Sequence, residues 1–78
     1  MARLPRVSGK EAERVLLRAG WYLHHTKGSH FYYKHPAKPG ARVTIPMHAG
    51  QIIAPKLLKR ILEDADLSVE EFIKLLRG

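Results

Sequence analysis

The chain has 78 residues, a formal net charge of +7, a hydrophobic fraction of 45% and no cysteine. This length suits one domain, which we expect to span residues 1–78. The lack of cysteine excludes disulfides and thiolate metal sites. No apolar run approaches the roughly 20 residues of a membrane helix. We therefore expect a soluble, cytoplasmic protein without membrane contacts.

The charge is unevenly distributed along the chain. Residues 1–62 contain twelve Lys/Arg and two acids, whereas residues 63–78 contain five acids and two basic residues. A strongly basic body favours a polyanionic partner, because each neutralised phosphate releases condensed counterions. The alternative is a basic protein with no role at nucleic acids.

The elements follow in the order α-β-β-β-α-α. Ser8 and Glu11 form a capping box that opens the first helix, and Gly20 ends it. Residues 21–26, 29–35 and 42–46 are rich in strand formers. Pro55 suits the first turn of a second helix, and a second capping box at 68–71 opens a third. These signals predict an α+β fold, in which helices pack on one face of a three-stranded antiparallel sheet.

The first two strands are expected to form a hairpin. A three-residue loop at 26–28 would pair His24 with His30 and Leu23 with Phe31. A two-residue loop would mix apolar and polar positions on each face. The predicted helix-covered face then holds Trp21, Leu23, Phe31, Tyr33, Val43 and Ile45. The predicted open face holds Tyr22, His24, His30, Tyr32, Lys34, Arg42 and Thr44.

A metal site is not expected, although the chain has five histidines. None of them has helical i, i+4 spacing, and no carboxylate lies near them in sequence to complete a typical ligand set. Nucleophilic catalysis by Ser29 lacks an orienting carboxylate. We therefore expect no metal and no cofactor.

RNA cleavage requires fewer catalytic groups from the protein than these reactions, because the 2′-hydroxyl of RNA is an internal nucleophile. Such a reaction needs a bound strand and a group that moves protons near neutral pH, which histidine can do. His30 is the candidate catalyst, although from the residues alone an exposed strand histidine is usually inert. The candidate RNA contacts are Lys27, Lys34 and Arg42 at phosphates, Tyr32 at a base, and His24 and His48. For His48 the alternative is a hydrogen bond that orders its loop, and His35 is expected to be a residue of the strand end.

Several motifs occur together along almost the whole chain. They are "SGKEAERVLLRAGWYL", "KGSHFYYKHP", "VTIPMHAG" and "KRILEDADLSVEEFIKLL". In this order and spacing they resemble the HicA-type mRNA interferase toxin family. The resemblance implies a fold similar to the double-stranded RNA-binding domain and cleavage of mRNA independently of translation. It also implies a HicB-type antitoxin as partner, and it places the catalytic histidine at His30.

Two other functions fit the same residues. A non-catalytic RNA-binding module would have the same charge and aromatics, and a regulatory protein could use its basic surface for an acidic protein partner. The chain also departs from the family pattern twice. Lys56-Leu57 replaces a usual Gly-Thr pair, and Asp66 replaces a usual glycine, although Asp tolerates left-handed geometry better than most residues.

Overall fold

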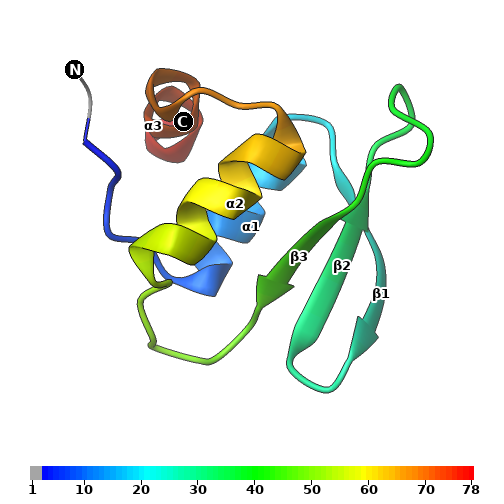
Figure 1. Ribbon diagram of the computed structural model, residues 1–78, viewed down its shortest axis with the longest axis horizontal. Helices are drawn as coiled ribbons and strands as arrows, with labels where there is room; N and C mark the ends of the chain where they lie inside the picture. The colour runs from blue at the N-terminus through cyan, green and yellow to red at the C-terminus, as the bar shows by residue number, and fades with distance from the viewer. Residues whose placement is uncertain (1–2) are drawn as a thin grey trace.

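The computed structural model describes residues 3–78. Its elements are α1 (Gly9–Arg18), β1 (Tyr22–Lys27), β2 (His30–Lys34), β3 (Val43–Pro46), α2 (Pro55–Ala65) and α3 (Val69–Arg77). The strands form one antiparallel sheet in the order β1-β2-β3. The helices lie to one side of this sheet, and α3 is the most distant from it (Figure 1). The predicted α+β fold and element order are confirmed.

Local sequence signals account for the helix ends. Ser8 and Ser68 each accept a hydrogen bond from the third helical residue, whose glutamate bonds back to the serine N–H. Pro55 occupies the first turn of α2, and Asp66 ends that helix in the left-handed conformation (φ 57°, ψ 43°). Asp66 therefore performs the conformational task of a glycine, as expected from the sequence.

The core lies between the sheet and the helices. It contains the buried side chains of Val7, Ala12, Val15, Leu16, Trp21, Tyr33, Val43, Ile45, Ile53, Leu58, Ile61, Leu62, Ala65 and Phe72. Trp21 is only 3% exposed, which confirms its predicted core position. Leu23 lies opposite Tyr33 and so on the helix-covered side, but it remains 42% exposed. Its predicted burial was wrong because the helices do not extend over this edge strand.

A buried hydroxyl joins the sheet to the first helix. Tyr33 is fully buried on β2, and its hydroxyl donates a hydrogen bond to the Glu13 carboxylate of α1. Burial raises the pKa of the Tyr33 hydroxyl far above its ordinary value, and the bond to Glu13 and that carboxylate's charge raise it further. Tyr33 therefore remains protonated in the folded protein at any ordinary pH.

Two long-range contacts hold the chain ends. Arg18, the last residue of α1, donates from Nη1 to the carbonyl oxygens of Leu75 (2.6 Å) and Leu76 (3.3 Å) at the end of α3. The Ile53 N–H donates to the Val7 carbonyl at 2.8 Å, which ties the segment before α1 to the loop before α2. Arg18 thus caps the carbonyls of another helix.

The hairpin differs from its prediction. Lys27 pairs with His30, so the loop is the two-residue turn Gly28-Ser29, with Gly28 at φ 58°. A glycine at the first central position fits a type II′ turn. The register shifts by one residue between Leu23 and His25, which leaves His24 as the extra residue of a β-bulge. The bulge absorbs the shift that a two-residue loop introduces, so the objection to that loop does not apply.

The bulge also changes which residues share a face. His25 lies opposite Tyr32 and thus on the open face, where His24 was predicted. The face of the sheet that the helices leave uncovered, called the open face below, carries Tyr22, His25, Lys27, His30, Tyr32, Lys34 and Thr44.

Candidate nucleic-acid interface

The Gly-Ser-His corner is a tight and well-anchored turn. Ser29 accepts a 2.6 Å hydrogen bond from the Met47 N–H, which fastens the turn to the end of β3. His30 follows as the first residue of β2, is exposed, and lies between Lys27 on β1 and Pro46 on β3. Facing residues of an antiparallel pair have Cβ atoms about 5 Å apart. The structure therefore presents an imidazole to solvent at a position paired with a lysine.

The two adjacent histidines of β1 touch each other. The Nδ1 atoms of His24 and His25 are 2.7 Å apart, and their rings meet edge to face. In a regular strand adjacent residues point to opposite faces, but the bulge interrupts this alternation. Such a hydrogen bond needs one protonated and one bare Nδ1 atom. His24 thus reaches the open face through His25 rather than directly.

Tyr32 is the centre of a stack on the open face. The His25 ring lies parallel to it, with centroids 4.4 Å apart and planes at 12°. The Arg42 guanidinium carbon lies 5.5 Å from the Tyr32 centroid, within cation–π range. Tyr32 is therefore already packed by protein groups from both neighbouring strand segments. The aromatic surface at this position therefore includes His25 as well as Tyr32.

The cations of this face are not neutralised by acids. Within residues 3–78 the ion pairs are Lys38–Asp66 and Arg60–Asp64, each at 3.3 Å, so Lys27, Lys34 and Arg42 have no carboxylate partner in the described chain. The acids of the basic body, Glu11 and Glu13, belong to α1 behind the sheet. The open face therefore has a positive potential, which favours a phosphate-rich ligand.

The other two histidines lie outside the three strands. His48 is exposed in the loop after β3 and lines a hollow of about 290 Å³ with Ser8 and Lys10 at the start of α1. His35 bonds through Nε2 to the Ala19 carbonyl (3.2 Å) and accepts the Ala37 N–H at Nδ1 (3.1 Å). Its ring also meets Trp21 edge-on. His35 is thus a structural residue of the strand end, whereas His48 is exposed beside the start of α1.

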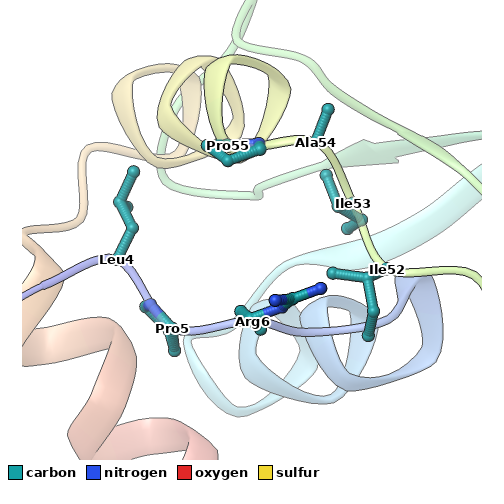
Figure 2. Close-up of a pocket in the computed structure, with 7 residues that line it drawn as sticks. All are labelled: Leu4, Pro5, Arg6, Ile52, Ile53, Ala54 and Pro55. Carbon is teal, nitrogen blue, oxygen red and sulfur yellow. The ribbon is translucent and has the colours of Figure 1, made fainter.

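The hollow in Figure 2 is larger but has different chemistry. It measures about 420 Å³ and lies between the segment Leu4–Arg6 and the segment Ile52–Pro55. Its lining is largely apolar, and Arg6 is the one ionisable residue among the side chains around it (Figure 2). Proton transfer at a phosphate requires titratable groups. We therefore place the candidate site on the sheet and not in this hollow.

Metal ligands do not gather anywhere in residues 3–78: no three His, Asp or Glu side chains lie close enough to hold an ion. Within the same range, no helix has the length and apolar character needed to cross a membrane.

These features define a class of protein: a small α+β domain whose helices cover one face of a sheet, with a histidine and free cations on the other. Residues 9–67 match the family model described as the HicA toxin of bacterial toxin–antitoxin systems. The chain therefore belongs to the HicA toxin family, which confirms the resemblance seen in its motifs. A comparison with curated proteins found no match. The matched range contains the whole sheet, α1 and α2, whereas α3 lies beyond it.

Proposed function

We propose that this toxin is an endoribonuclease that cleaves mRNA without the ribosome, with His30 as its acid–base residue. The observation that carries the proposal is the position of His30, exposed at an anchored corner beside Lys27 and on the same face as unpaired cations. Lys27, Lys34 and Arg42 hold phosphates, and the stack of His25 and Tyr32 receives a base. His24 supports His25 from the bulge.

The proposed reaction uses the nucleophile of the substrate. The 2′-hydroxyl oxygen attacks the adjacent phosphorus as its proton passes to a base, and the bond from phosphorus to the 5′-oxygen breaks. The leaving oxygen takes up a proton, so the products are a cyclic phosphate and a 5′-hydroxyl. His30 accepts the first proton or donates the second, while Lys27 stabilises charge on the phosphoryl oxygens. This route needs no divalent ion, so we expect cleavage to persist in excess EDTA.

The experiment is incubation of purified protein with a long mRNA in the absence of ribosomes. Proton transfer by a positioned side chain contributes roughly 10²–10⁴-fold in rate, so His30→Ala and His30→Gln should both lose that factor. His30 is exposed and outside the core, so either change should cost less than about 0.5 kcal/mol of stability. RNA affinity should stay within a few fold, and growth arrest on expression should disappear.

A core substitution provides the contrasting control. Trp21→Ala should lose activity by unfolding, since emptying a large core position costs about 3–5 kcal/mol. If folded His30→Ala protein cut RNA at the parental rate, His30 would not be the catalyst. If the parent bound RNA and never cut it, the protein would be a non-catalytic RNA-binding module.

The partner expected for this toxin is a HicB-type antitoxin. We propose that it covers the open face, because an acidic surface there neutralises repulsion among the cations and blocks substrate. The complex should then lose RNA binding together with cleavage. Tight antitoxin binding that left RNA affinity unchanged would place the antitoxin elsewhere.

A further inference from the structure

A second basic feature lies beyond the edge of the open face, between β3 and α2. A hollow of about 410 Å³, called the basic hollow below, is lined by Lys34, Gly40, Arg42, Thr44, Arg60 and Asp64. Its three cations come from three different parts of the chain: β2, the segment before β3, and α2. Asp64 is the one acid in the lining. The hollow therefore carries an excess of positive charge and a hydroxyl donor, which together suit a phosphate.

Arg60 is oriented so that most of its donors remain available. Its Nε lies 3.3 Å from an oxygen of Asp64, so the salt bridge engages one side of the guanidinium. The two terminal nitrogens keep their N–H groups for another anion. The side chain is 72% exposed, and the bond to Asp64 restricts its direction. Asp64 therefore acts as a positioning residue for Arg60.

Helix stability does not explain this pair. An acid placed four residues after a base is the less favourable order in a helix, and an acid near a helix C-terminus opposes the macrodipole. Asp64 lies one residue before the end of α2. Exposed pairs of this kind contribute little stability in any case. The arrangement is better explained by a ligand for Arg60 than by a need to hold α2 together.

The far wall of the basic hollow is also fixed in place. Lys38 reaches Asp66 at the end of α2 with a 3.3 Å ion pair. The backbone bonds from Lys38 N–H to the His35 carbonyl and from Ala41 N–H to the Lys38 carbonyl fold the intervening loop into turns. This loop carries Gly40 and leads into Arg42, so its attachment to α2 keeps Arg42 and Arg60 on the same hollow.

The basic hollow is continuous with the proposed active face. Lys34 belongs to both, and it lies four residues along β2 from His30 on the same side of the sheet. At about 3.3 Å per strand residue, the two side chains are about 13 Å apart along the strand. A single RNA strand that has a phosphate at His30 therefore reaches the hollow within a few nucleotides.

We propose that the basic hollow binds a backbone phosphate of the RNA strand flanking the cleavage point, with Arg60 as its specific contact. This inference rests on the proposed ribonuclease function and extends it. It makes α2 part of the substrate track, which runs from the Gly-Ser-His corner along β2 and over the β3 edge. It also assigns a role to Arg60, Asp64 and Thr44, which were not among the candidate RNA contacts predicted from the sequence.

The test measures binding of the parent toxin to a labelled, single-stranded 2′-O-methyl RNA of about ten nucleotides, which lacks the free 2′-hydroxyl needed for cleavage. Arg60→Ala should weaken binding about 3- to 10-fold and reduce the slope of log affinity against log salt by about 0.7, the value of one single-strand phosphate contact. The matched control is Lys59→Ala, which removes the same charge from the next residue of α2. Lys59 faces a different hollow, with Leu4 and Leu62, so its removal should change affinity less than about twofold.

Probe length gives a second readout. Shortening the RNA from the end that reaches the basic hollow should weaken its binding to the parent in steps. One of these steps should correspond to loss of the phosphate in the hollow, and this step should be absent in Arg60→Ala. An unchanged thermal midpoint for both variants confirms that they fold.

The proposal would be overturned if Arg60→Ala and Lys59→Ala weakened RNA binding equally, or if Arg60→Ala left the dependence on RNA length unchanged. In either case, cleavage of RNA by the parent protein would still support the ribonuclease function. Loss of antitoxin affinity without loss of RNA affinity in Arg60→Ala would also overturn it and assign the hollow to the protein partner. Failure of the parent to bind RNA at all would remove the ribonuclease function and the hollow's role together.

Discussion

The hydrogen bond from Tyr33 to Glu13 makes a testable contribution to stability. Tyr33→Phe keeps the buried ring and removes only the hydroxyl. Hydrogen bonds to charged groups contribute about 1.5–3 kcal/mol, but Glu13 is only half-buried and regains water when its donor is removed. We therefore expect a loss of about 1–2 kcal/mol near neutral pH, which lowers the melting temperature of a domain of this size by about 4–8 °C per kcal/mol.

The same substitution should change the response to alkali. The pKa of Tyr33 is raised in the folded protein by burial and by Glu13, whereas in the unfolded chain it is about 10. Above that pH unfolding releases a proton, so the parent loses about 1.4 kcal/mol per pH unit from this group. Tyr33→Phe lacks this loss. Its deficit should therefore shrink as pH rises and approach zero at about pH 11.

Urea unfolding followed by the fluorescence of the buried Trp21 measures both effects, with titrations near pH 8 and near pH 11. Tyr22→Phe is the matched control, because Tyr22 is 46% exposed and should change neither the stability nor its alkaline slope. A Tyr33→Phe protein as stable as the parent at pH 8 would refute the assigned energy. A deficit that stayed constant up to pH 11 would refute the raised pKa.

Two further stability predictions use the same assay. Arg18→Ala should lower the free energy of unfolding by about 1 kcal/mol, because the last carbonyls of α3 lose their donor. The control Arg14→Ala, on the same helix without such a bond, should lower it by less than about 0.5 kcal/mol. Equal losses would contradict the capping role of Arg18. Gly20→Ala should cost about 2–4 kcal/mol, because φ is +96° and a Cβ would lie 2.8 Å from His35 Nε2. Gly40→Ala, at a similar φ of +88° with open space around it, should cost only about 1–2 kcal/mol, and an equal cost at both glycines would exclude the steric contribution of His35.

Local signals in the sequence predicted the helices well. Both capping boxes, Pro55 and Asp66 act within one helical turn, so their effect depends little on the rest of the fold. The helix-covered positions of Tyr33, Val43 and Ile45 were also predicted, because strand alternation holds through β2 and β3. The family resemblance came from motifs and is confirmed over residues 9–67.

The sequence predicted the hairpin less well. Gly28-Ser29 is itself a signal for a two-residue turn, and it was set aside because a bulge is not visible in a sequence pattern. The sequence also did not predict the bonds of Arg18 to the end of α3 or the hollow that Arg60 shares with Lys34 and Arg42. Both depend on the approach of segments far apart in the chain, such as Arg18 and Leu75, which are 57 positions apart, and no local pattern reports such contacts.

The bulge at His24 has a consequence for how this toxin can vary. It divides β1 into an inner part, Tyr22 and Leu23, next to the core and an outer part, residues 25–27, next to the Gly-Ser-His corner. Substitutions in the outer part can change the open face without altering which inner residues face the helices. A one-residue deletion at His24 would remove the extra residue and restore regular alternation, so Leu23, Thr26 and Lys27 would keep their sides. The bulge therefore accommodates one additional residue in β1 without changing the side that either part of the strand presents.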